Sequence, residues 1–146
     1  MGVEIEHKFL VNDDSYRSMQ SAEHRISQGY LSKDPERVVR IRTLDNKGYL
    51  TVKGRNEGDK RLEFEYEIPL FEARRLLTLC LPPIIEKIRH IVFFEGHKWE
   101  IDEYLGSLAP LVTAEIELSS SDEEYELAPF VGRNVTGDPR YYNSNL

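Results

Sequence analysis

The chain has 146 residues, of which 31% are charged, and its formal net charge at pH 7 is −7. This length fits one domain, and the hydrophobic content of 40% is typical of a folded protein. The acidic balance argues against a nucleic-acid-binding surface, which is normally basic. We find no long apolar run and no secretory leader pattern, so no membrane span and no export are expected. Cys80 is the only cysteine, which fits a protein of the reducing cytoplasm.

Polar and apolar residues alternate along most of the chain, which predicts β-strands with two unlike faces. The expected strands cover residues 3–10, 24–32, 36–44, 48–54, 61–68, 84–95, 97–104 and 112–119. Short turn sequences separate several of these segments, as at residues 45–48 and 95–97. Because short connections join antiparallel strands, we expect mostly antiparallel neighbours.

Three helices are expected beside these strands. Residues 69–81 begin with a proline and are followed by two more, which marks both ends of a helix. Ser121 and Glu124 have the spacing of a capping box, which predicts a helix near 122–130. A short helix is also expected near 14–22.

The polar faces of the expected strands carry blocks of like charge. The clearest blocks are Arg40 with Arg42, Lys87 with Arg89, and Glu115 with Glu117. Like charges on one face repel, so folding gains little from them unless opposite charge or a ligand lies nearby. If the strands close into a barrel, blocks of opposite sign can face one another across its lumen. For any one strand, a charged face that simply meets water explains the pattern equally well.

A lumen with both charges suits a polyphosphate bound together with a divalent cation. Arg and Lys neutralise phosphate oxygens, and clustered carboxylates hold Mg²⁺ or Mn²⁺ through oxygen ligands. The sequence lacks a GxxxxGK[ST] loop, so phosphate binding would have to come from side chains. The four histidines do not have zinc-ligand spacing.

Short charged motifs follow one another along the whole chain. They are Glu4-x-Glu6-x-Lys8, Arg40-x-Arg42, Leu50-Thr51-Val52-Lys53-Gly54, Arg61-x-Glu63-x-Glu65, Lys87-x-Arg89, Trp99-Glu100-Ile101-Asp102, Ala114-Glu115-Ile116-Glu117 and Val135-Thr136-Gly137-Asp138-Pro139-Arg140-Tyr141. Each motif is weak alone, but in this order the series resembles the CYTH superfamily, also called the triphosphate tunnel metalloenzymes. The resemblance implies one mostly β (α+β) domain over residues 1–146. Its fold would be a closed barrel of eight antiparallel strands with a charged lumen and a few helices packed outside.

The resemblance also implies roles for individual residues. The implied metal ligands, for Mg²⁺ or Mn²⁺, are Glu4, Glu6, Glu115 and Glu117. The implied phosphate-binding residues are Lys8, Arg40, Arg42, Lys53, Lys87 and Arg89. The implied catalytic residues are Glu63, Glu65, Lys87 and Asp102. Glu63, Glu65 or Glu117, or a second metal, would position and deprotonate the attacking water. Glu63, Glu65 and Asp102 would hold a second metal or orient the basic residues.

The implied activity is metal-dependent hydrolysis of a triphosphate. Inorganic triphosphate is favoured as substrate because no insertion in this short chain looks built for a nucleobase. The alternatives are a class IV adenylate cyclase, a thiamine triphosphatase using aromatic residues such as Tyr30, Tyr49 and Tyr104, and a polyphosphate- or nucleotide-binding module without turnover. The expected partner is a small molecule rather than nucleic acid or a membrane. Exposed apolar strand faces would also permit a homodimer.

Overall fold

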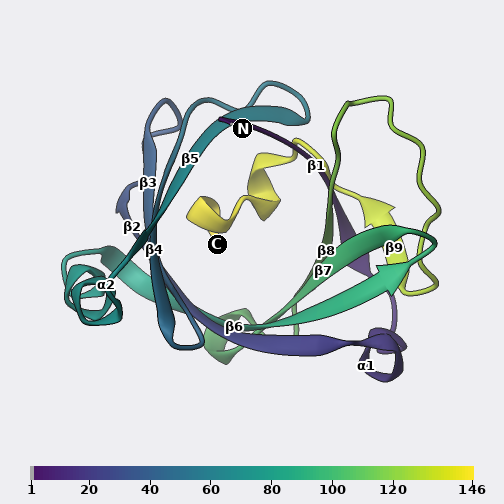
Figure 1. Ribbon diagram of the computed structural model, residues 1–146, viewed down its shortest axis with the longest axis horizontal. Helices are drawn as coiled ribbons and strands as arrows, with labels where there is room; N and C mark the ends of the chain where they lie inside the picture. Colours follow the sequence, from purple (N-terminus) through teal and green to yellow (C-terminus); the bar gives the residue numbers. More distant parts are fainter. Residues whose placement is uncertain (1) are drawn as a thin grey trace.

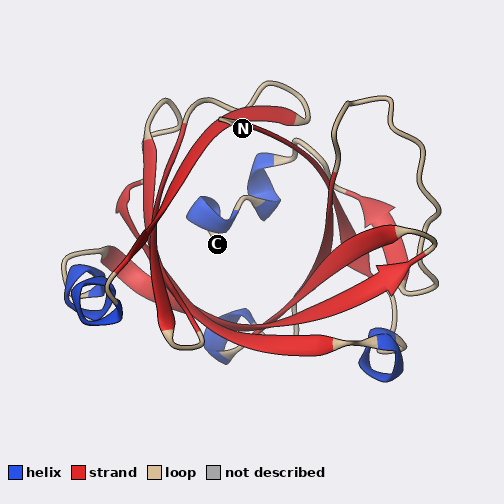
Figure 2. Cartoon of the chain, viewed as in Figure 1, coloured by secondary structure: helices blue, strands red, loops and turns tan. Residues whose placement is uncertain are grey.

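The structure is a computed structural model that describes residues 2–146, and it contains nine β-strands in one sheet. The strands are β1 (Val3–Val11), β2 (Ala22–Ser32), β3 (Val38–Leu44), β4 (Lys47–Lys53), β5 (Lys60–Ile68), β6 (Leu81–Phe94), β7 (His97–Tyr104), β8 (Val112–Glu117) and β9 (Val131–Asn134). Eight of them form a closed antiparallel ring in the order β5-β4-β3-β2-β6-β7-β8-β1 (Figures 1 and 2). The predicted eight-stranded barrel is therefore confirmed.

The ring closes between β1 and β5, and this seam is short. Its register pairs Val3 with Leu62, Glu4 with Arg61 and Ile5 with Lys60. The opposite edge of β1 pairs over five positions with β8. The additional strand β9 pairs with the C-terminal part of β1, outside the ring. The sequence analysis did not predict β9.

The main apolar core lies outside the barrel wall. There, Trp99 and Ile101 of β7 and Ile116 of β8 pack against Phe130, and all four side chains are at most 1% exposed. Helix α2 (Leu70–Leu77) covers β3 and β4. It approaches so closely that a Cβ atom added at Gly48 would lie 2.6 Å from the Cβ of Ala73. An apolar exterior leaves the inner strand faces free to carry charge.

The prediction of a helix near residues 122–130 is wrong. Residues 118–130 form an irregular arm, in which the Ser121 hydroxyl donates to Asp59 (2.8 Å) instead of capping a helix. Glu123 accepts hydrogen bonds from the backbone N–H (2.7 Å) and hydroxyl (2.6 Å) of Ser119. The arm buries Ala128 and Phe130 against the barrel. Apolar burial against the barrel therefore outweighs the local capping preference.

The other expected helices are present but shorter. Helix α1 spans Tyr16–Met19 and α2 ends at Leu77, because β6 already begins at Leu81. Three 3₁₀ helices, η1 (Gly106–Leu108), η2 (Pro139–Tyr141) and η3 (Asn143–Asn145), complete the chain. Within residues 2–146, no helix has the length and apolar composition needed to cross a membrane.

The C-terminal segment lies inside the ring rather than outside it (Figure 1). Its last residue, Leu146, packs against a second buried cluster of Tyr30, Val38, Ile85 and Tyr104. These residues share the inner face of the barrel with the charged lumen residues. Val38 lies two positions from Arg40 and Ile85 two positions from Lys87, and residues two apart on a strand point to the same side. One end of the lumen is therefore apolar and the remainder is charged.

Candidate active site

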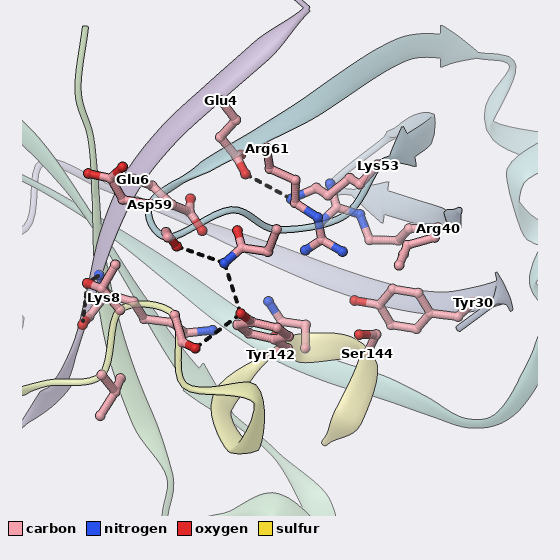
Figure 3. A pocket seen from close by; sticks show the side chains of 17 residues that line it. Glu4, Glu6, Lys8, Tyr30, Arg40, Lys53, Asp59, Arg61, Tyr142 and Ser144 are labelled. Carbon is pink, nitrogen blue, oxygen red and sulfur yellow. Dashed lines mark hydrogen bonds and ion pairs between the residues drawn. The ribbon is translucent and has the colours of Figure 1, made fainter. Parts of the chain in front are cut away.

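The barrel gathers the charged residues that the sequence analysis singled out. Strand alternation turns them to the inner face of the ring, where two adjoining cavities lie. The inner cavity, of about 170 Å³, is lined by Glu4, Glu6, Arg40, Arg42, Lys53, Glu63, Glu65, Arg89, Glu100, Glu115, Glu117 and Asn143. The mouth cavity shares Glu4, Glu6, Arg40, Lys53 and Asn143 with it and is also lined by Lys8, Tyr30, Arg61 and Tyr142 (Figure 3).

Lys53 links two carboxylates at the junction of the cavities. Its Nζ lies 3.2 Å from Oε1 of Glu4, a pair drawn in Figure 3, and 3.1 Å from Oε2 of Glu63. Burial and the neighbouring Arg40 disfavour the charge of Lys53, but the surrounding carboxylates outweigh them and raise its pKa. The ammonium group therefore stays charged among acidic neighbours.

The carboxylates of β1 are crowded and poorly neutralised. Burial raises the pKa of Glu4 to about 7, against the opposing effect of Lys53. Burial and the nearby Glu115 and Glu4 raise the pKa of Glu6 well above its usual value. Glu115 behaves oppositely: despite its burial, Lys8 and other cations lower its pKa to about 2. Two carboxylates of this cluster thus tend to bind protons when no other cation is present.

Two arginines of β3 share one carboxylate. Nη2 of Arg40 and Nη2 of Arg42 lie 3.3 and 3.2 Å from Oε2 of Glu65, which also accepts a 2.8 Å hydrogen bond from the Thr51 hydroxyl. The Nε groups of both arginines are buried and have no hydrogen-bond partner among residues 2–146. Since buried donors are normally paired, these two Nε groups are candidates to bind an acceptor that the chain itself does not supply.

Lys87, Arg89 and Asp102 form a buried ionic cluster beneath the inner cavity. Asp102 accepts from Nε (2.8 Å) and Nη2 (2.9 Å) of Arg89 and lies 2.8 Å from Nζ of Lys87. Burial lowers the pKa of Lys87 to about 8, although Asp102 opposes the shift. The two cations lower the pKa of Asp102 far below its usual range in spite of its burial. Neither Lys87 nor Asp102 lines either of these two cavities, whereas Arg89 lines the inner one, so the predicted catalytic roles of Lys87 and Asp102 stay predictions.

The chemistry of the lumen fits a hard divalent cation. Within residues 2–146, no three carboxylate, imidazole or thiol groups already converge as in a preformed metal site. Lysine ammonium groups lie among the carboxylates instead: Lys53 pairs with Glu4 and Glu63, and Lys8 lies 3.5 Å from Glu115. Oxygen donors that already attract protons and ammonium groups are suitable ligands for Mg²⁺ or Mn²⁺. The four predicted metal ligands, Glu4, Glu6, Glu115 and Glu117, all line the inner cavity.

The sequence analysis left several lumen residues out of its site. Thr51 lies two positions from Lys53 and Glu100 two positions from Asp102, so each points to the same side of its strand as a predicted site residue. Strand alternation alone was therefore sufficient to identify them. The C-terminal contacts gave no such signal, because 3₁₀ helices have no recognisable periodicity. There, the Tyr141 carbonyl accepts a 2.6 Å hydrogen bond from Lys8 Nζ, and the Tyr142 hydroxyl accepts one of 2.9 Å from Asn56.

Comparisons with known proteins agree with this geometry. The family model described as "CYTH domain" matches residues 2–142. The chain is 50% identical to an inorganic triphosphatase of Acetivibrio thermocellus, covering 100% of this chain and 94% of that protein. It is 31% identical to an inorganic triphosphatase of Nitrosomonas europaea, with 98% and 95% covered. A solved inorganic triphosphatase structure superimposes with a TM-score of 0.68 at 29% identity, covering 97% of this chain and 95% of that one.

The family match spans almost the whole chain, and both relatives exceed 30% identity over nearly their full length. The closed ring and its charged inner face agree with the fold that the motif series implied. The chain therefore belongs to the CYTH domain family.

Proposed function

We propose that the chain is a divalent-metal-dependent hydrolase that cleaves inorganic triphosphate to pyrophosphate and phosphate, and that its whole length forms one catalytic domain. The charge balance of the inner cavity carries this proposal. Seven carboxylates and four cations line it, which leaves an excess of three acidic groups. Glu4 and Glu6 of this set bind protons readily because burial raises the pKa of both, and a divalent cation that replaced those protons would let the cavity accept a highly charged phosphate anion.

The cations of the inner cavity have the roles expected for phosphoryl transfer. Arg40 and Arg42 offer their unpaired Nε groups to phosphate oxygens, together with Arg89, Lys53 and, from the mouth, Lys8. These groups stabilise charge that accumulates on the transferred phosphoryl group. A bound divalent ion would supply further neutralisation of the phosphate oxygens.

Water activation is the task of the carboxylates. Glu63, Glu65 and Glu117 all line the inner cavity, so each is placed to orient a water molecule and accept its proton. Glu65 is held by Thr51 and two arginines, which makes it a positioning residue for those arginines rather than a free base. Glu63 is likewise paired with Lys53. We therefore assign the general base to Glu117, which has no ion-pair partner among residues 2–146, and the metal ion to Glu4, Glu6 and Glu115.

The relatives and the cavity support triphosphate as the substrate. Both curated relatives are inorganic triphosphatases. No aromatic side chain lines the inner cavity, whereas Tyr30 and Tyr142 line its mouth, so ATP and thiamine triphosphate belong in the test of substrate choice. A small-molecule substrate and a free Cys80 thiol also agree with a cytoplasmic enzyme.

The test is phosphate release from inorganic triphosphate with Mg²⁺ or Mn²⁺, with ATP and thiamine triphosphate in parallel and a chelator as control. We expect fast, chelator-sensitive release from inorganic triphosphate that is lost in the Glu4→Gln/Glu6→Gln variant. Glu86→Gln is the matched control, because Glu86 lies exposed on the outer face of β6 and its carboxylate bonds only the Ser27 hydroxyl among residues 2–146. Cyclic AMP and pyrophosphate formed from ATP would instead indicate a cyclase. Tight binding without turnover of any substrate would indicate a binding module.

A further inference from the structure

The backbone of Glu6 lies where strand pairing along one edge of β1 is interrupted. On that edge, residues 3–5 pair with β5, whereas Phe9 and Val11 pair with β9. Between these two pairings, the N–H group of Glu6 donates to the backbone carbonyl of Asp59 (3.1 Å), in the loop that joins β4 to β5. The backbone position of a predicted metal ligand therefore depends on a loop residue.

Two contacts fix the side chain of Asp59. Its Oδ2 lies 2.9 Å from Nε2 of His7, and its Oδ1 accepts a 2.8 Å hydrogen bond from the Ser121 hydroxyl. His7 is itself held, because its Nδ1 lies 2.7 Å from the hydroxyl of Tyr125. We call these four residues the clamp. The clamp joins the β4–β5 loop, strand β1 and the arm of residues 118–130 at one point.

The loop that carries Asp59 is ordered from within as well as by the clamp. Gly58 precedes it at φ +66°, a conformation that favours glycine, and the side-chain amide of Asn56 donates to the Gly58 carbonyl (2.8 Å). The side chains of His7 and Asp59 are only 19% and 18% exposed, so water competes little for their contact. The loop can therefore hold the Asp59 carbonyl in one place.

We propose that Asp59 is a positioning residue for the metal site. Its clamped side chain aligns its backbone carbonyl with the N–H group of Glu6, and this contact sets where the Glu6 carboxylate stands in the lumen. The inference rests on the proposed function, in which Glu6 binds the metal ion with Glu4 and Glu115. Residues that orient a metal ligand typically contribute about 10–100-fold to metal affinity.

The charge of Asp59 offers a rival explanation, which two variants separate. Asp59 also lines the mouth cavity, where a carboxylate attracts cations whatever its hydrogen bonds (Figure 3). Asp59→Asn removes the charge but keeps the shape: its amide oxygen accepts from Ser121, and its NH₂ group donates to the unprotonated ring nitrogen of a neutral His7. Positioning predicts that Asn preserves what Ala loses, whereas attraction by charge predicts that both variants are equally weak.

Binding of Mn²⁺ without substrate, followed by electron paramagnetic resonance of the free ion, tests the proposal. Asp59→Ala should raise the dissociation constant about tenfold, and Asp59→Asn should stay within about twofold of the wild type. Asp45→Ala is the matched control, because Asp45 also contacts a histidine, His24 (2.6 Å), and accepts from the backbone N–H of Arg25 (2.9 Å). Neither of those partners lines the two lumen cavities, so this change should leave the constant unaltered.

A second variant leaves Asp59 in place. Ser121→Ala breaks the clamp from the arm, so it should weaken Mn²⁺ binding in the same direction and add little to Asp59→Ala. Fluorescence of the buried Trp99 checks that each variant is folded.

Equal Mn²⁺ constants for the wild type and Asp59→Ala would overturn the proposal, as would equally weak binding by the Ala and Asn variants. A wild type that binds no Mn²⁺ would overturn it together with the metal dependence of the proposed function. Because the readout is metal affinity, a protein that binds Mn²⁺ as expected but releases no phosphate would refute the hydrolase and not the role of Asp59.

Discussion

Replacement of Asp102 by Asn tests the buried ionic cluster most directly. Asp102 is 1% exposed and neutralises two cations, Lys87 and Arg89, through three contacts of 2.8–2.9 Å. The amide of Asn keeps the shape but removes the charge, and its NH₂ group points donors at donors. Two cations would then be buried without their shared counter-ion.

The expected cost follows from that loss. Breaking a buried ion pair by removing one partner costs about 3–5 kcal/mol. The free energy of unfolding of an ordinary domain is about 5–15 kcal/mol, so Asp102→Asn should lose a large share of it. An anion in the inner cavity would lie beside Arg89 and replace part of the missing charge. Pyrophosphate should therefore stabilise Asp102→Asn more than the wild type.

Urea unfolding followed by Trp99 fluorescence measures both effects, since Trp99 is the only tryptophan and is fully buried. Asp45→Asn is the control, because Asp45 is an exposed carboxylate whose ion pair with His24 should contribute less than about 1 kcal/mol. The reasoning is refuted if Asp102→Asn loses less than about 1 kcal/mol, or if pyrophosphate stabilises both proteins equally.

Three further predictions concern the lumen. Arg42→Ala should raise KM for triphosphate about tenfold or more while shifting Tm by no more than about 4 °C. The small change in Tm is expected because burial, together with repulsion from Arg40 and Arg89, already disfavours the charge of Arg42 and lowers its pKa to about 10. A large loss of Tm would contradict this. Burial lowers the pKa of Lys87 to about 8 in the folded protein, against 10.5 for an unperturbed lysine. The unfolded chain therefore binds more protons between these values, and stability should rise with pH there. Denaturant titrations across this window should lose that slope in Lys87→Met. Thr51→Val removes the 2.8 Å hydrogen bond to Glu65 from a fully buried site and should cost about 1–3 kcal/mol in urea unfolding, together with a lower kcat; unchanged values of both would show that Glu65 needs no such support.

The strands were predictable because each has one apolar and one charged face. Arg40 and Arg42 fell on the same side of β3 by simple alternation, and the same rule placed Glu4, Glu6 and Lys8 together on β1. Alternation fixes the side of a strand but not its neighbours. The contact between Lys53 and both Glu4 and Glu63 depends on the closing register of β1, β4 and β5, which no local pattern encodes.

The failures of prediction have a common physical origin. Ser121 and Glu124 have capping-box spacing, but Ser121 bonds to Asp59, a residue 62 positions away. Leu146 enters the lumen because an apolar cluster at one end of the ring receives it. In both cases a long-range partner decided the local structure, and a single sequence does not reveal such partners.

The closing seam has a consequence for how the protein is made. Strand β1 leaves the ribosome first, yet its partners are β5, β8 and β9, and the contact of Lys8 with Glu115 spans 107 positions. Val3–Ile5 can pair with β5 once that strand has been made, but the segment from Glu6 to Leu10 must wait unpaired, with Phe9 exposed, until β8 has been synthesised. Contacts of such sequence separation slow folding, so closure of the ring is expected to be a late step. Glu4, Glu6 and Lys8 are all on β1, so the nascent chain has no complete site before the last strand of the ring has joined.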